Sequence, residues 1–134
     1  MNDRKVITVR EVMSSDVHWI DSMRTVAEAL REMLSMKTSV LMVNKSHDYD
    51  EWGMILVSHI ARQVLSKERS PERINVYEIM QKPVIKVEAE MDIRYCAALF
   101  VHHSLTRAPV VENGEVIGLV SPVNLVLDGL GSQV

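Results

Sequence analysis

The chain has 134 residues, of which 47% are hydrophobic and 25% are charged, as is typical of a folded globular protein rather than a disordered one. The net charge of −3 comes without a block of basic residues, which argues against nonspecific nucleic-acid binding. A lone cysteine, Cys96, excludes an intrachain disulfide, and no apolar run approaches the ~20 residues that a membrane-spanning helix needs.

The first half of the chain predicts a strand, a helix, two strands and a second helix. Val17–Ile20 is the expected first strand. It precedes a helix whose apolar residues share one face, namely Val26, Ala29, Leu30, Met33 and Leu34. Val40–Val43 and Trp52–Val57 predict buried strands around a polar loop, and Ser58 is the expected N-cap of a helix over Ile60–Leu65.

The second half repeats this order. A strand is predicted at Val84–Val87, and Asp92 is the expected cap of a helix with Ile93, Ala97, Phe100, Val101 and Ser104 on one face. Cys96 lies in this helix and is expected to be a small buried side chain. Strands follow at Arg107–Glu112 and Val116–Val120.

Turn and cap signals complete the second half. Asn113-Gly114 predicts a type I′ hairpin turn, because both central residues of that turn need a positive φ. Ser121-Pro122 predicts the start of the last helix, with a cap followed by proline at the first helical position.

Two short segments of the sequence each occur a second time in a similar form. Val9-Arg10-Glu11-Val12-Met13 returns as Val76-Tyr77-Glu78-Ile79-Met80, and Trp52-Gly53-Met54-Ile55 returns as Ile117-Gly118-Leu119-Val120. The repetition predicts two tandem units, 1–66 and 76–134, joined by a charged linker over 67–75. Alternating strands and helices predict an α/β (α+β) fold, and we expect a shared core because each half alone is small.

The repeated pattern resembles a tandem pair of cystathionine-β-synthase (CBS) domains, also called a Bateman module. The resemblance rests on Tyr77–Met80 with Pro83-Val84-Ile85, on Arg107–Val111 and on Gly118–Leu125, with weaker copies in the first unit. It implies two pseudo-symmetric β-α-β-β-α units packed through their small sheets, with two related clefts. It also implies regulation rather than catalysis, association into a homodimer, and binding of adenine nucleotides or S-adenosylmethionine.

The resemblance also implies roles for residues of the second unit. Ser121 and Asn124 stand at the hydroxyl and ribose positions, where Asn124 replaces the usual aspartate and its amide carbonyl is expected to accept a ribose hydroxyl. Arg107 stands where related proteins place an arginine that reaches phosphates; the alternative is that it is a solvated residue at a strand edge. The expected base slot, which could also be plain core, consists of Ile85, Val87, Pro109 and Leu119.

The first unit departs from the pattern. Leu56 and His59 take the hydroxyl and ribose positions, and only a neutral His59 could accept a hydrogen bond there. Ser39 matches Arg107 if one residue of length difference is allowed after the first helix. We therefore expect the second unit to form the better site, and the first to be degenerate or retuned.

Other classes of function receive less support. His102 and His103 are adjacent, so on a helix they point about 100° apart and are unsuited to chelating a metal. The sequence also lacks common hydrolase and phosphate-loop motifs, so neither a catalytic residue nor a metal site is expected. A second reading is a ligand-free adaptor whose degenerate clefts serve only dimerisation or docking.

The resemblance thus implies a regulatory module that senses AMP, ADP, ATP or S-adenosylmethionine. It needs no resident cofactor, and its dimer geometry would signal to another protein. Because Met1–Lys5 lead into no long apolar segment, we expect a cytoplasmic protein with no membrane or nucleic-acid partner. The sequence leaves open the regulated protein and whether the dimer is parallel or antiparallel.

Overall fold

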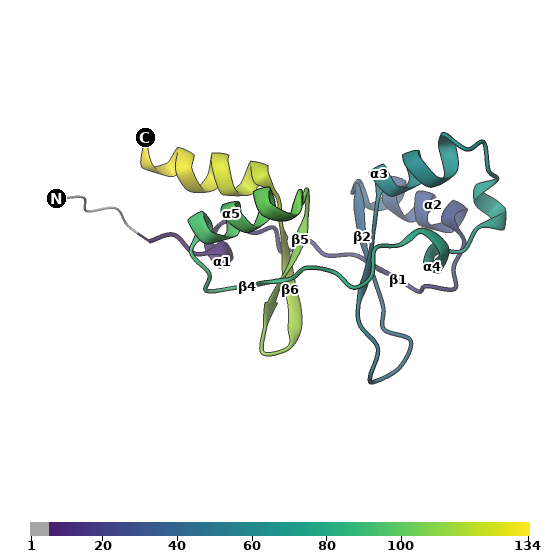
Figure 1. Cartoon of the computed structure of the whole chain (residues 1–134), viewed down its shortest axis with the longest axis horizontal. Helices are drawn as coiled ribbons and strands as arrows, with labels where there is room; N and C mark the ends of the chain where they lie inside the picture. Colours follow the sequence, from purple (N-terminus) through teal and green to yellow (C-terminus); the bar gives the residue numbers. More distant parts are fainter. Residues whose placement is uncertain (1–5) are drawn as a thin grey trace. The chain divides into compact units, whose positions relative to one another are not determined.

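A computed structural model describes residues 6–134 and divides them into two compact units. The continuous unit comprises His18–Val84, and the split unit comprises residues 6–17 together with Ile85–Val134. Each unit contains a three-stranded mixed sheet and helices (Figure 1), which confirms the predicted α/β fold. Residues 1–5, where the sequence predicts no apolar leader, lie outside the described part of the chain.

The continuous unit has strand order β1-β2-β3. β1 (Trp19–Ile20) pairs parallel to β2 (Val40–Val43), which pairs antiparallel to β3 (Gly53–Leu56). Its helical segments are α2 (Val26–Met36), α3 (Val57–Ile60) continued by η1 (Ala61–Leu65), η2 (Pro71–Arg73) and α4 (Val76–Ile79).

The split unit repeats this topology with strand order β4-β5-β6. β4 (Val87–Glu88) pairs parallel to β5 (Ala108–Glu112), which pairs antiparallel to β6 (Glu115–Val120). Its helices are α1 (Val9–Val12), α5 (Ile93–His103) and the C-terminal helix over residues 122–133, which contains η3 (Asn124–Gly129) and η4 (Leu130–Gln133).

Local signals explain the helix and turn boundaries. The Thr25 hydroxyl accepts the Glu28 N–H at 3.1 Å at the start of α2, and the Asp92 carboxylate accepts the Arg94 N–H at 2.8 Å at the start of α5. The hairpin turn is confirmed, with φ of 52° at Asn113 and 78° at Gly114.

Two predicted boundaries are wrong. The helix after β3 begins at Val57 with Leu56 as its N-cap, not at Ser58, because His59 Nδ1 accepts the Leu56 N–H at 3.1 Å. The strand predicted at Val84–Val87 is only Val87–Glu88. The chain just before it lies instead against β3, where Gln81 and Met54 exchange two backbone hydrogen bonds of 2.8 and 3.0 Å.

The short helix that opens each repeat packs with the sheet of the other repeat. Val9 donates its N–H to Met91 O at 2.9 Å in the split unit, and Val76 donates its N–H to Arg24 O at 2.8 Å in the continuous unit. The packing units therefore do not coincide with the sequence repeats 1–66 and 76–134. Each unit is built from segments of both repeats.

The two repeated motifs of the sequence meet in this exchange. A Cβ added at Gly118 would lie 2.5 Å from Met13 Sδ, and one added at Gly53 would lie 2.7 Å from Met80 Sδ. A side chain at either glycine would thus collide with the methionine that ends the opening helix. The packing of Met13 from the first repeat thus depends on Gly118 of the second, and the packing of Met80 from the second depends on Gly53 of the first.

Each unit buries its own apolar cluster between its sheet and its helices. In the split unit the cluster consists of Ile7, Val9, Val12, Val87, Ala89, Ile93, Cys96, Phe100, Ala108, Val110, Val120 and Leu125. Cys96 is fully buried as predicted, and burial raises the pKa of its thiol to about 11.

Two residues expected on buried helix faces are exposed. Leu34 of α2 is 79% exposed and Val101 of α5 is 82% exposed, so the predicted apolar faces are wider than the faces that pack on the sheets. The two residues follow the caps Thr25 and Asp92 by the same nine positions. An apolar side chain is therefore left on the surface at equivalent places in both units.

Candidate functional site

The candidate site lies at one end of the sheet in the split unit. Ala108 of β5 pairs with Val120 of β6, and the next residues outward on the two strands are Arg107 and Ser121. Arg107 is half-buried and donates from its guanidinium to Thr106 O at 2.9 Å. Ser121 is buried and begins the C-terminal helix, so a cation and a helix start share this end of the sheet.

Ser121 and Asn124 form a closed hydrogen-bond network. Asn124 Oδ1 accepts both the backbone N–H and the hydroxyl of Ser121, each at 3.0 Å, and Ser121 Oγ accepts the Asn124 N–H at 3.4 Å. A carbonyl oxygen has two lone pairs, so these two bonds satisfy the acceptor that the sequence assigned to a ribose hydroxyl. In this structure the Asn124 side-chain oxygen therefore caps the N-terminus of the C-terminal helix.

Asp128, which the sequence did not single out, contacts the same side chain. Asn124 Nδ2 donates to Asp128 Oδ2 at 3.2 Å, which fixes the orientation of the amide. One N–H of Nδ2 remains as the polar group that Asn124 can offer a ligand. The contact could have been predicted from the sequence, because residues four apart on a helix, such as Asn124 and Asp128, lie next to each other.

His59 holds the equivalent cap in the continuous unit. Its Nδ1 accepts the Leu56 N–H, as Asn124 Oδ1 accepts the Ser121 N–H. Burial, followed by the charge of Arg62, lowers the pKa of His59, which favours the neutral ring that the cap requires. The predicted correspondence of these two positions agrees with the structure, although His59 also uses its acceptor locally.

The residue equivalent to Arg107 is Val40, not Ser39. The caps Thr25 and Asp92 are 67 residues apart, and so are the left-handed residues Lys37 and Ser104 that end the two helices. No length difference separates helix from strand, because the extra residues lie in the later loop over 44–52. Val40 is buried and apolar, so the first repeat does lack the cation at this position.

The predicted base slot divides between two faces of the sheet. Val87 belongs to the buried cluster beneath the helices, together with Ala108, Val110 and Val120. Pro109 and Leu119 are also buried, but they pair with each other and alternate with those core residues, which places them on the opposite face. Ile85 precedes β4 and is half-buried. Val87 is therefore core in this unit, whereas Pro109 and Leu119 share a separate apolar face.

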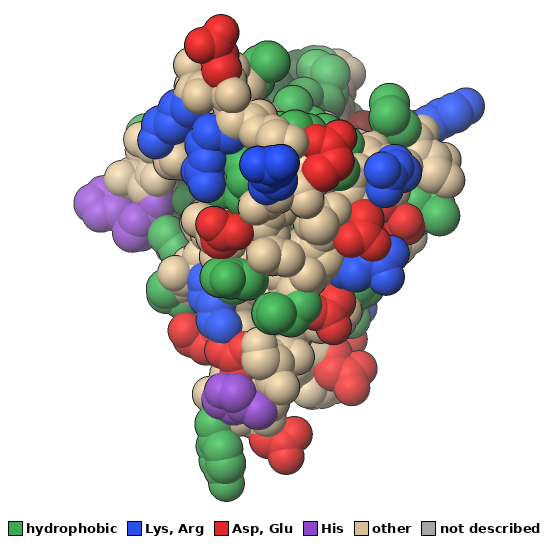
Figure 2. All heavy atoms as spheres, turned by 90° about the vertical axis from the view of Figure 1, so that its right-hand side faces the viewer, with side chains coloured by type: hydrophobic (Ala, Val, Ile, Leu, Met, Phe, Trp, Pro, Cys, Tyr) green, Lys and Arg blue, Asp and Glu red, His purple; other side chains and the backbone are tan. Residues whose placement is uncertain are grey.

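Other site chemistries receive no support from the described residues. Within residues 6–134, no three His, Cys, Asp or Glu side chains are grouped so that they could hold a metal ion. Over the same residues, no helix is long and apolar enough to cross a bilayer. Figure 2 shows acidic and basic side chains intermingled over the face in view.

Curated relatives match almost the whole chain but are longer than it. A CBS domain-containing protein from Arabidopsis thaliana, CBSCBSPB1, is 28% identical over 92% of this chain and 22% of its own length. An uncharacterized 33.4 kDa protein in the ribosomal RNA operon of Thermofilum pendens is 25% identical over 86% of this chain and 41% of its own length. The chain thus spans less than half of these two relatives.

Solved structures and the family model agree. The hexameric CBS-CP12 protein from bloom-forming cyanobacteria superposes with a TM-score of 0.90 at 30% identity, covering 96% of this chain and 74% of that one. A CBS-domain protein from Burkholderia ambifaria gives 0.82 at 27% identity, covering 96% and 97%. The model of the CBS domain matches residues 9–66 and again 76–127. The chain belongs to the CBS domain family, and its two copies of that domain form a Bateman module.

Proposed function

We propose that this CBS pair senses an adenosine-containing ligand, either AMP, ADP, ATP or S-adenosylmethionine, and regulates another protein through the geometry of a homodimer. The observation that carries the proposal is the placement of Arg107 beside the helix start at Ser121. A planar guanidinium suits phosphate oxygens, and the buried pair Pro109 and Leu119 lies on the adjoining strands.

The site favours one repeat over the other. The split unit has an arginine and a serine at the positions where the continuous unit has Val40 and Leu56, neither of which has a polar side chain. We therefore propose that ligand binding depends on the residues of the second repeat. His59 retains an acceptor only by giving up its cap bond to Leu56.

Association into a homodimer is supported by apolar side chains left exposed at equivalent places. Leu34 and Leu65 are exposed on the helices of the continuous unit, and Val101 and Leu130 are exposed on those of the split unit. Paired exposed apolar patches of this kind indicate a protein interface. The related CBS-CP12 protein is hexameric, which shows that one relative of this fold assembles further.

Isothermal titration with adenosine, AMP, ADP, ATP and S-adenosylmethionine tests the proposal. Arg107→Ala should weaken the phosphorylated ligands by about tenfold or more, the scale of one charge-assisted hydrogen bond, and leave adenosine nearly unchanged. Arg94→Ala removes an exposed arginine of α5 in the same unit and serves as the matched control. Absence of binding by the wild type to all five compounds would reject the sensor proposal.

A ligand-free adaptor is the second candidate function. It is favoured by one observation, that the acceptors of Asn124 and His59 are both engaged in helix caps. An adaptor should dimerise normally while showing no heat of binding and no shift of the melting temperature with any of the five compounds. A saturating ligand at 100 times its dissociation constant adds about 2.7 kcal/mol of apparent stability, so the two functions are readily distinguished.

A further inference from the structure

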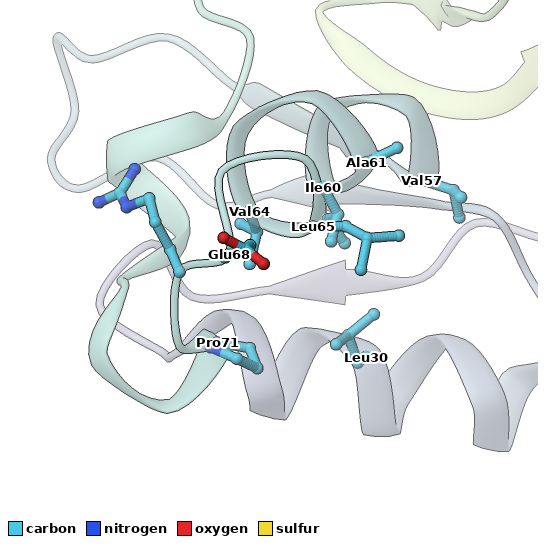
Figure 3. Close-up of a pocket in the computed structure, with 9 residues that line it drawn as sticks. Leu30, Val57, Ile60, Ala61, Val64, Leu65, Glu68 and Pro71 are labelled. Atoms are coloured by element: carbon cyan, nitrogen blue, oxygen red, sulfur yellow. The ribbon is translucent and has the colours of Figure 1, made fainter.

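Two features on the surface of the continuous unit expose apolar side chains. One is a groove of about 350 Å³ between α2 and the helix formed by α3 and η1, where Leu30 and Leu65 point toward each other (Figure 3). Glu68 and Arg69 at this groove carry opposite charges, so the groove specifies no sign of charge in an occupant. The other feature is the loop over 44–52, which joins β2 to β3 and projects beyond the ends of these strands (Figure 1).

This loop is longer than the hairpin requires. Val43 of β2 pairs with Gly53 of β3, and the pairing of the two strands stops there, which leaves nine residues in the loop over 44–52. In the second repeat the strands keep pairing up to the two-residue turn at Asn113-Gly114. The same hairpin can thus be closed by a tight turn, so the length of the loop calls for a reason other than joining two strands.

Hydrogen bonds restrain the tip of the loop. The Asp50 carboxylate accepts the Ser46 N–H at 2.8 Å and pairs with Lys82, a residue outside the loop. The Asp50 N–H donates to His47 O at 3.0 Å, and the Tyr49 N–H donates to His47 Nδ1 at 3.3 Å. A loop that is already ordered loses less conformational entropy when it binds a partner.

The tip presents one large side chain between acids. Tyr49 is 96% exposed, and Asp48 and Glu51 close to it are exposed as well. The single Lys or Arg of the loop, Lys45, lies over the ring of Trp52, with Nζ 4.7 Å from the ring centre. A tyrosine ring offers a large contact area at a small cost in side-chain entropy, and tyrosine is frequent among the residues that dominate binding energies.

We propose that the tip of this loop contacts the protein that the CBS pair regulates, and that this partner offers an apolar pocket for the Tyr49 ring with Lys or Arg at its rim. The pocket buries the ring, and the cations face Asp48 and Glu51. A nucleic acid or an anionic membrane would place phosphates against these carboxylates, so the charges favour a protein. The inference rests on the proposed function for the existence of a regulated protein and identifies the surface that contacts it.

A small host molecule with the same chemistry tests the tip directly. An amino-substituted β-cyclodextrin has an apolar cavity with an ammonium rim, and plain β-cyclodextrin is its neutral counterpart. NMR of the full chain with carbon-13 labelled tyrosine follows its three tyrosines separately. The cationic host should shift the signal of Tyr49 and bind there at least about threefold more tightly than the neutral host at low salt.

Tyr95 is the internal control of this titration. It is 73% exposed on α5, and its neighbour in the chain is the cation Arg94 rather than an acid. The cationic host should therefore bind more weakly at Tyr95 than at Tyr49. Equal affinity of the two hosts for Tyr49, or a preference of the cationic host for Tyr95, would overturn the inference.

Photo-crosslinking in cells that naturally express the chain then tests the partner. The full chain carries p-benzoylphenylalanine in place of Tyr49, and the matched control carries it in place of Glu115, an exposed residue beside the turn of the other hairpin. A protein captured only through position 49 is purified and titrated with the wild type and with variants. Tyr49→Ala should weaken its binding about tenfold or more and Asp48→Lys about threefold at low salt, whereas Glu115→Lys should change nothing.

Two results of this experiment would overturn the inference. One is the capture of no protein through position 49 beyond those captured through position 115, and the other is equal binding of the captured protein to the wild type and all variants. Titration of the wild type with the five adenosine compounds reports on the sensor proposal separately. A partner that depends on Tyr49, found for a chain that binds none of these compounds, would keep the contact surface and reject the ligand.

Discussion

Replacing Gly118 with alanine should destabilise the split unit strongly, because the added methyl has no room. The new Cβ would lie 2.5 Å from Met13 Sδ and 2.7 Å from the carbonyl oxygen of Ser14. The methionine tip can rotate away, but Ser14 is held by two backbone hydrogen bonds to Leu119, of 2.8 and 2.9 Å. Overpacking of this kind costs about 1–3 kcal/mol, and straining one of these bonds adds about 1 kcal/mol.

The matched control is Gly53→Ala in the continuous unit. Its Cβ would lie 2.7 Å from Met80 Sδ and 3.2 Å from Val43 Cβ, a slightly tight contact, whereas the nearest backbone atom, Gln81 O, would be 3.4 Å away. Rotation of Met80 should relieve most of this collision, so the expected cost is only about 1 kcal/mol. The two glycine substitutions, equivalent in the sequence repeat, should therefore differ in their cost by about 1–3 kcal/mol.

Urea unfolding followed by far-UV circular dichroism and by tryptophan fluorescence measures both costs. The chain has two tryptophans, Trp19 and Trp52, which both lie in the continuous unit. Fluorescence therefore reports on that unit, whereas circular dichroism follows both. Adding Met13→Ala to Gly118→Ala should restore only part of the stability, because the collision with Ser14 O remains. If Gly118→Ala cost no more than Gly53→Ala, the reasoning from backbone proximity would be refuted.

Three further outcomes are expected. Folding lowers the pKa of His59, so the free energy of unfolding should fall as the pH drops from about 6.5 toward that lowered pKa. The variant His59→Asn keeps a hydrogen-bond acceptor but does not titrate. Unfolding curves measured over a pH series should therefore show a smaller loss of stability for this variant in that range. Asn124→Asp combined with Asp128→Asn should tighten adenosine binding about fivefold in calorimetry, because a carboxylate at position 124 can cap the helix with one oxygen and accept a ribose hydroxyl with the other. The second substitution removes the Asp128 carboxylate, which would otherwise repel the new one, and unchanged affinity would remove position 124 from the site. The hydrogen bond from Lys82 lowers the pKa of Asp50, so Asp50→Asn should lose less stability than the wild type as the pH falls below about 4, and parallel acid-unfolding curves would contradict this.

The sequence was sufficient where structure is decided locally. Caps such as Asp92, the turn at Asn113-Gly114 and the proline that follows Ser121 act within a few residues of where they stand. Their geometry depends little on the rest of the chain. The α/β class and the family followed from such signals, repeated in the same order.

The sequence failed where a decision depended on residues far apart. Matching Ser39 to Arg107 put a length difference in the wrong loop, which the equal spacing of the two helix ends, Lys37 and Ser104, and the strand pairing reveal. The acceptor of Asn124 was assigned to a ligand because its bonds to Ser121 depend on the rotamer, not on the residue type. Leu34 and Val101 fit an apolar helical face, but burial is decided by what packs against that face.

The exchanged opening helices also set an order of events during synthesis. All of the continuous unit, His18–Val84, is synthesised before Ile85–Val134, and its core contains no residue of that later segment. The core of the split unit cannot be completed until Leu125 has been synthesised, because Ile7, Val9 and Val12 share this core with Leu125. Its closure therefore joins residues 6–17 to Ile85–Val134, and contacts between segments so far apart in sequence are entropically costly and slow to form. The opening helix of the first repeat, α1, is thus synthesised before the rest of its unit but packs only after that unit has been made.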